Sequence, residues 1–175
     1  AQLQDETKAI QFMRRIREMV FLEKKNITKW EHLSNATSEI GLDTVRLKKD
    51  YETKAKELFQ ADLKLAKKLG VRGFPTLFFT DSLNNQQMVY GFKPYKAFED
   101  AVLKTFSKAT KINYDKSWTS LFNKYSTLTT REFAELSGST KLDSEIVLQK
   151  LTDQDKLSKI TTKNGILWTI KNASR

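Results

Sequence analysis

A proline stands directly before the most compact apolar run of this chain. Residues 72–79 read Arg-Gly-Phe-Pro-Thr-Leu-Phe-Phe. Because proline has no N–H to donate to a sheet ladder, Pro75 fits the first residue of a strand and no later one. A cis bond between Phe74 and Pro75 would leave main-chain groups open to an extended peptide, whereas a trans bond would only begin the strand. The run predicts a buried strand over residues 76–80, with a binding edge beside it if the bond is cis.

Helical periodicity dominates the sequence before this strand. Apolar residues recur at steps of three and four, residues 28–31 fit a capping box, and Asp43 is expected to cap the third helix. The helices expected here cover residues 3–23, 28–40, 43–50 and 53–69. The apolar band of the first helix is wide, so we expect it to be buried against more than one neighbour. After the strand, a second strand is expected over residues 87–90, and a helix from Pro94 to about Lys108.

The last third of the chain predicts a separate small domain. Apolar periodicity fades over residues 109–117, which we interpret as a linker. Helices are expected over 118–125, 129–136 and 143–153. Residues 129–132 fit a capping box at the start of the second, and Ile146, Val147 and Leu151 face inward from the third. Two alternating strands then surround Asn164-Gly165, a strong hairpin signal. This order is typical of a winged helix, and the predicted domains are residues 1–108 and 118–175, joined by the linker 109–117.

The residue types present exclude several kinds of chemistry. The 175 residues contain no Cys and a single His, His32. The chain itself therefore offers no dithiol, no thiolate metal site and no nucleophile–histidine pair. We predict no catalytic residue, no metal and no cofactor within it. No apolar run is long enough to span a bilayer, and the net charge of +10 favours acidic partners.

Residues 72–79 resemble the cis-proline loop of thioredoxins and their DsbA-like relatives. The second strand, the break at Gly91 and the helix from Pro94 are similar to the closing β-β-α of that fold, and the preceding helices resemble the DsbA helical insertion. The fold class that this resemblance implies is α/β. It comprises a partial DsbA-like thioredoxin fold, with the helical insertion and β-β-α, followed by a small winged-helix-like α+β tail. Residues 12–27, 59–64 and 128–168 resemble the YjbH or SpxH branch, cytosolic adaptors that deliver the regulator Spx to the ClpXP protease.

The resemblance implies a protein-binding role for the proline loop. In that family the residue before the cis proline contacts the bound protein, and Phe92 and Tyr95 extend the surface expected beside it. The predicted partner-binding residues are Gly73, Phe74, Pro75, Thr76, Phe92 and Tyr95. The family's N-terminal β-α-β unit, which bears the Cys motif, has no counterpart in this sequence. We therefore expect the strand over residues 76–80 to pair with a segment outside residues 1–175 or with a second chain that completes the sheet.

Three functions remain open. The first is a cytoplasmic adaptor or chaperone-like portion that docks a protein, either a ClpXP-linked regulator or a misfolded or thiol-bearing client. The second is the substrate-binding half of a thiol–disulfide oxidoreductase or isomerase, which a Cys-X-X-Cys upstream of Ala1 would favour. The third is a winged-helix DNA binder. Asp143, Glu145 and Asp153 on the expected recognition helix count against it, because phosphates attract basic side chains, so nucleic acid is not the expected partner.

Overall fold

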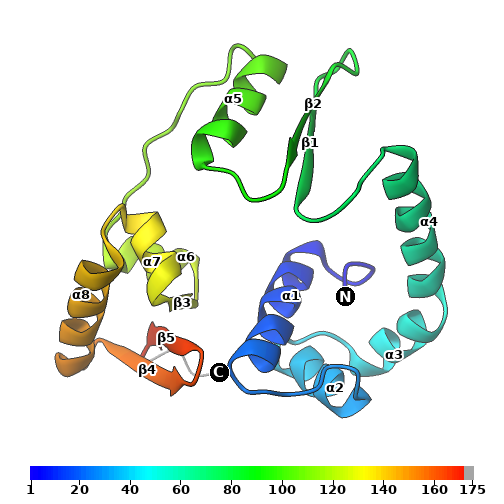
Figure 1. Cartoon of the computed structure of the whole chain (residues 1–175). Helices are drawn as coiled ribbons and strands as arrows, with labels where there is room; N and C mark the ends of the chain where they lie inside the picture. The colour runs from blue at the N-terminus through cyan, green and yellow to red at the C-terminus, as the bar shows by residue number, and fades with distance from the viewer. Residues whose placement is uncertain (172–175) are drawn as a thin grey trace. The chain divides into compact units, whose positions relative to one another are not determined.

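The computed structural model describes residues 1–171, in which eight helices and five strands follow one another (Figure 1). The helices are α1 (Glu6–Phe21), α2 (Trp30–Glu39), α3 (Thr44–Glu52), α4 (Lys54–Lys68), α5 (Tyr95–Thr105), α6 (Trp118–Lys124), α7 (Thr130–Ser137) and α8 (Lys141–Asp153). The strands are β1 (Thr76–Thr80), β2 (Gln86–Tyr90), β3 (Thr127–Thr129), β4 (Leu157–Thr162) and β5 (Gly165–Ile170). This mixture of helices and small antiparallel sheets is the predicted α/β class.

Contacts divide the chain into two compact units. One consists of Ala1–Asp50 together with the segment that begins at Tyr114, and the other is Tyr51–Asn113. This grouping places α1, α2 and most of α3 with the C-terminal tail. The domain boundaries predicted at residues 108 and 118 stay a prediction.

A small apolar core holds the first three helices together. Its buried members are Phe12, Met19, Ala36, Leu42 and Leu47. Phe12 and Met19 lie on α1, whereas Ile10 and Met13 of the same helix are exposed. The apolar band of α1 is thus buried only in part. The helix has two neighbours, α2 and, through Arg14, the tail, and burial of the band itself against both stays a prediction.

A side-chain cap marks the start of α3 but not that of α2. Asp43 caps α3 as predicted, because its Oδ1 accepts the N–H of Arg46 at 2.9 Å. The predicted capping box at residues 28–31 is wrong. The Thr28 hydroxyl donates to Oδ1 of Asn26 at 2.7 Å, and α2 begins after Lys29 without a side-chain cap. The nearby asparagine competes successfully for the hydroxyl that the cap would need.

The C-terminal tail has the larger buried core, which gathers around Trp168. The buried members are Leu121, Phe122, Leu128, Phe133, Leu148, Leu151, Leu157 and Trp168. The Trp168 indole N–H donates to the Thr130 hydroxyl at 3.0 Å, so the polar atom of this fully buried ring is satisfied. Ile146 and Val147 are exposed, contrary to expectation, and Leu148 is buried in their place.

The tail contains a three-stranded antiparallel sheet in the order β3-β5-β4. The hairpin around Asn164-Gly165 is confirmed, with Thr162 paired to Gly165 across the turn. The short strand β3 was not predicted; it pairs Thr127 with Thr169. The element order is helix, strand, helix, helix and hairpin, and the winged-helix assignment stays a prediction.

The second unit is built on the hairpin β1–β2. The strands are antiparallel, with Thr76 opposite Tyr90 and Phe78 opposite Met88. Helix α5 packs on this hairpin, where Val89 and Ala101 are buried. Helix α5 ends at Thr105, one turn before the expected end, and its N-cap is Pro94. Helix α4 precedes the hairpin and has no buried residue, although its apolar spacing predicts a core-facing side.

Among residues 1–171, none of the helices is both long and apolar enough to cross a bilayer.

Candidate functional site

The predicted partner-binding residues lie at the open end of the β1–β2 hairpin. Four of them are consecutive, and the peptide bond between Phe74 and Pro75 is cis. The Thr76 hydroxyl donates to the carbonyl oxygen of Gly73 at 2.7 Å and so closes the loop on itself. Phe92 follows the last strand residue by two positions. We call residues Gly73, Phe74, Pro75, Thr76 and Phe92 the loop surface.

A main-chain hydrogen bond holds the two sides of the loop surface together. The N–H of Gly91 donates to the carbonyl oxygen of Pro75 at 2.9 Å. Phe74 directly precedes Pro75 and Phe92 directly follows Gly91, so the two residues lie beside this hydrogen bond on the two sides of the hairpin. They are 89% and 93% exposed. Two exposed aromatic residues at neighbouring positions of the hairpin are typical of a binding surface. Single exposed apolar residues are common on any protein, whereas clustered ones mark interaction sites.

The backbone of Phe74 is also free. Within the described part of the chain, neither its N–H nor its carbonyl oxygen takes part in a hydrogen bond. Unpaired main-chain donors and acceptors beside a strand are the groups that an incoming extended peptide uses. The loop surface therefore combines apolar rings with main-chain hydrogen-bonding capacity.

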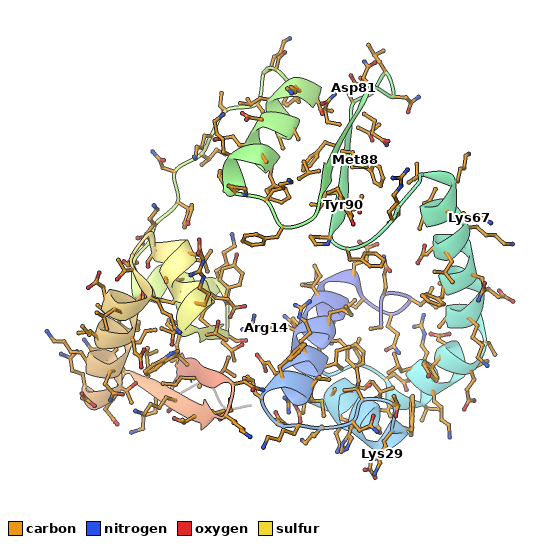
Figure 2. The ribbon with its side chains drawn as sticks, viewed as in Figure 1. Arg14, Lys29, Lys67, Asp81, Met88 and Tyr90 are labelled. Atoms are coloured by element: carbon orange, nitrogen blue, oxygen red, sulfur yellow. The ribbon has the colours of Figure 1, made fainter. Side chains whose placement is uncertain are left out.

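Gly73 allows the loop to lie against β2. A Cβ at this position would stand 2.9 Å from the phenol oxygen of Tyr90, so any larger residue would displace that ring. Tyr90 and Met88 lie on β2 and Asp81 lies at the tip of the hairpin (Figure 2). Tyr90 and Met88 are half-exposed, which leaves one face of the hairpin only partly covered.

Tyr95 is not joined to the rings of the loop surface by any contact found in residues 1–171. It begins α5, and the Lys111 ammonium lies 5.0 Å from its ring centroid. Lys111 also pairs with Glu99 at 3.2 Å. Tyr95 is exposed over most of its surface, so its predicted role in binding stays a prediction.

Among residues 1–171, no third strand pairs with either edge of the β1–β2 hairpin. Phe78 and Phe79 of β1 are half-buried. A hairpin of this size is marginally stable without a third strand or a packed helix. Helix α5 supplies the packing on one side, and the strand that we expect to complete the sheet stays a prediction.

A polar cluster lies between α1 and the tail, within the first unit, around Arg14 of α1, which Figure 2 labels. Arg14 binds the carboxylate of Glu132, and a cavity of about 190 Å³ opens beside this pair. Burial alone would raise the pKa of Glu132, but the hydrogen bonds from Arg14 and from Thr129 outweigh it and hold this pKa below its ordinary value. The carboxylate is therefore ionised and engaged, which makes it a poor general acid or base at neutral pH.

The described residues offer no metal centre. Among them, no group of three or more His, Cys, Asp or Glu side chains is arranged to hold an ion. The full sequence contains no Cys, so thiol chemistry cannot arise from this chain. What the loop surface offers chemically is exposed aromatic rings beside main-chain groups that can form hydrogen bonds.

Sequence reasoning did not single out Arg72 and Lys93, the charged residues that border the loop surface. Both side chains are exposed, and each stands one or two positions from an exposed phenylalanine. The signal in the sequence is a basic residue next to each phenylalanine: Arg72 two positions before Phe74, and Lys93 directly after Phe92. It is visible only when the hairpin brings the two stretches together.

A proline loop that leads into an antiparallel hairpin with a helix packed on it defines a thioredoxin-like protein. The thioredoxin family model matches residues 1–100. This chain belongs to the thioredoxin family.

Similar proteins include adaptors from several bacteria. The chain is 28% identical to the ClpXP adapter protein SpxH of Halalkalibacterium halodurans, over 96% of this chain and 56% of the relative. It is 26% identical to the ClpXP adapter protein SpxH of Bacillus subtilis, over 96% and 57%. The protein of the same name from Staphylococcus saprophyticus is 23% identical over 98% and 66%. The chain thus spans somewhat more than half the length of the first two relatives.

Proposed function

We propose that this chain is the protein-binding portion of a cytoplasmic adaptor, and that it docks its partner on the loop surface. The observation that carries this proposal is the pair of exposed rings, Phe74 and Phe92, beside a main chain with unpaired groups. The relatives are named as ClpXP adapter proteins, which supports a role in presenting another protein to that protease.

The partner that this role implies is a regulator or client protein linked to ClpXP. For the SpxH branch that regulator is Spx, and a misfolded or thiol-bearing client is the alternative. The sheet would be completed by an N-terminal unit or by a second chain at the free edge of β1, which supports a larger working protein than the hairpin alone.

The test is direct binding between purified proteins. The purified regulator Spx, fluorescently labelled, is titrated with the chain, and the dissociation constant is read from anisotropy. Replacing Phe74 by Ser removes one exposed ring, and we expect binding at least about tenfold weaker, as for the loss of an anchoring aromatic side chain. Binding that is unchanged by Phe74→Ser would contradict docking on the loop surface.

Leu83→Ser is the matched control. Leu83 is 80% exposed and lies in the turn of the same hairpin, at the opposite end from the loop surface. Leu83→Ser removes a comparably exposed apolar side chain that lies away from the loop surface, so Spx binding should be retained. Circular dichroism of both variants checks that the chain stays folded.

The two other functions stay predictions. A thiol–disulfide oxidoreductase would need its Cys residues outside this chain. A DNA-binding tail would need a basic face on α8, where Asp143 and Glu145 are both exposed.

A further inference from the structure

The loop surface has positive charge that the protein does not neutralise. Arg72 precedes Phe74 by two residues and Lys93 follows Phe92 directly; both side chains are exposed. Neither has an ion-pair partner among residues 1–171. An exposed cation without a partner keeps its full attraction for an incoming anion, screened only by salt.

The carboxylates nearby are already engaged. Glu99 pairs with Lys111 at 3.2 Å, and Asp100 pairs with Lys96. Asp81 accepts the main-chain N–H groups of Leu83 and Asn85, each at 2.8 Å, which holds the hairpin turn. The hairpin and α5 therefore satisfy their own acids and leave the two bases at the loop surface free for another molecule.

The same surface carries apolar area of a size that matters for binding. Each phenylalanine side chain can bury roughly 150–250 Å². With both side chains about nine-tenths exposed, the loop surface offers roughly 270–450 Å² of apolar area, bordered by cations. A ligand that fits both properties needs apolar groups and negative charge close together.

We propose that the segment bound by the loop surface is an acidic, extended peptide that carries an apolar side chain between its carboxylates. This deepens the proposed function, on which it rests, by naming the chemistry of the partner segment. The apolar side chain packs against Phe74 and Phe92, the carboxylates face Arg72 and Lys93, and the peptide backbone pairs with the free main-chain groups of Phe74.

A peptide fits this surface better than a polyanion does. A nucleic acid strand would use the rings for stacking, but it gains most of its affinity from many phosphate contacts, and the loop surface offers two cations. Its phosphates would also leave the N–H and carbonyl of Phe74 without the alternating donors and acceptors that a peptide supplies.

The experiment uses three synthetic peptides and the full chain. The acidic probe is acetyl-Glu-Glu-Leu-Phe-Glu-Glu-amide; the neutral probe has Gln for Glu, and the basic probe has Lys for Glu. Binding is measured by calorimetry at low and at high salt. We expect the acidic probe to bind at least about tenfold more tightly than the neutral one at low salt, with the difference shrinking at high salt.

Two double variants locate the charge effect. Arg72→Gln with Lys93→Gln should abolish the preference for the acidic probe. Lys104→Gln with Lys108→Gln is the control, because it removes the same positive charge from exposed positions at and beyond the end of α5. Neither lysine has an ion pair among the described residues. This control should preserve the preference for the acidic probe. If both double variants lose the preference for the acidic probe equally, the preference reflects net charge alone and the proposal is overturned. Equal affinity of the wild-type chain for the acidic and neutral probes would overturn it as well.

Further outcomes separate this proposal from the function on which it rests. If Phe74→Ser weakens Spx binding but no probe shows an acidic preference, the docking function stands and the acidic segment is wrong. If the acidic probe binds through Arg72 and Lys93 while Spx binding ignores Phe74→Ser, the proposed function fails instead. A single-stranded oligonucleotide that binds more tightly than the acidic probe, and loses affinity in the Arg72 and Lys93 variant, would overturn the peptide assignment.

Discussion

The guanidinium of Arg14 binds both carboxylate oxygens of Glu132, although the two residues are 118 positions apart in the chain. Glu132 also accepts the main-chain N–H of Thr129 at 2.8 Å and so forms half of the capping box of α7. One carboxylate thus joins α1 to the first turn of a tail helix. Thr127 strengthens the connection, because its hydroxyl donates to Glu18 of α1 and its carbonyl oxygen accepts from Arg14 at 3.1 Å.

Replacing Glu132 by Gln tests the energy of this connection. The Arg14 and Glu132 side chains are 29% and 39% exposed, so water screens the pair less than it screens a surface pair. Glutamine can still close the capping box but cannot carry the charge. We expect the free energy of unfolding in urea to fall by about 1–2 kcal/mol, the range for a charged hydrogen bond that is partly buried.

Glu135→Gln is the control for that measurement. Glu135 pairs with Arg131 one turn away, and both side chains are about two-thirds exposed. We expect this change to alter the free energy of unfolding by less than about 0.5 kcal/mol. If Glu132→Gln and Glu135→Gln lower the free energy of unfolding equally, the connection between α1 and the tail stabilises the fold no more than an exposed ion pair does.

Acid should weaken the same connection. Burial raises the pKa of Glu132, but the hydrogen bonds with Arg14 and Thr129 lower it by more. In the folded protein, the pKa of Glu132 therefore lies below its ordinary value. A lowered pKa contributes stability that is complete above the ordinary pKa and is lost as the pH falls through the folded one. Urea titrations over a series of acidic pH values should therefore show a gap between wild type and Glu132→Gln that narrows as the pH falls. A gap that stays constant or widens would show that the ionised carboxylate is not the stabilising form.

The hydroxyl of Thr129 can be tested separately from the ion pair. It accepts the N–H of Glu132 at 3.2 Å and forms the other half of the capping box. Thr129→Ala should lower the free energy of unfolding by about 1 kcal/mol, whereas Thr129→Ser keeps the hydroxyl and should retain most of it. Thermal unfolding followed by circular dichroism checks both, and a serine variant as unstable as the alanine one would assign the loss to β3 rather than to the cap.

Local signals in the sequence predicted most of the elements but few of their contacts. The capping box at Thr129, the cap at Asp43 and the turn at Asn164 are each decided by residues within four positions, and all three are confirmed. The strand β3 was missed because its last residue, Thr129, is also the N-cap of α7, where the capping signal dominates. The false capping box at Thr28 shows the limit of such signals, since the side chain of Asn26 took the hydroxyl.

Long-range relationships could not be predicted from the sequence alone. Nothing in the residues around Arg14 or Glu132 indicates that they meet, because the pairing depends on how α1 and the tail pack. At the candidate site, one feature could be predicted and another could not. The proline loop was recognisable from residues 72–79, but the basic border of Arg72 and Lys93 became visible only once the Gly91 to Pro75 hydrogen bond aligned the two stretches.

Side chains reserved for binding should contribute little to folding, and the loop surface offers a clear case. Phe74 and Phe92 bury almost none of their surface, so Phe74→Ala with Phe92→Ala should change the free energy of unfolding by less than about 0.5 kcal/mol per site. Val89 lies on β2 opposite Leu77 and is buried on the hairpin that α5 packs against, and Val89→Ala should cost about 1–2 kcal/mol in the stability of the hairpin unit. Hydrogen exchange of the β1 and β2 amides measures that unit directly. If the two phenylalanine variants accelerate exchange as much as Val89→Ala does, their rings pack against the protein in solution and are not free to receive a partner.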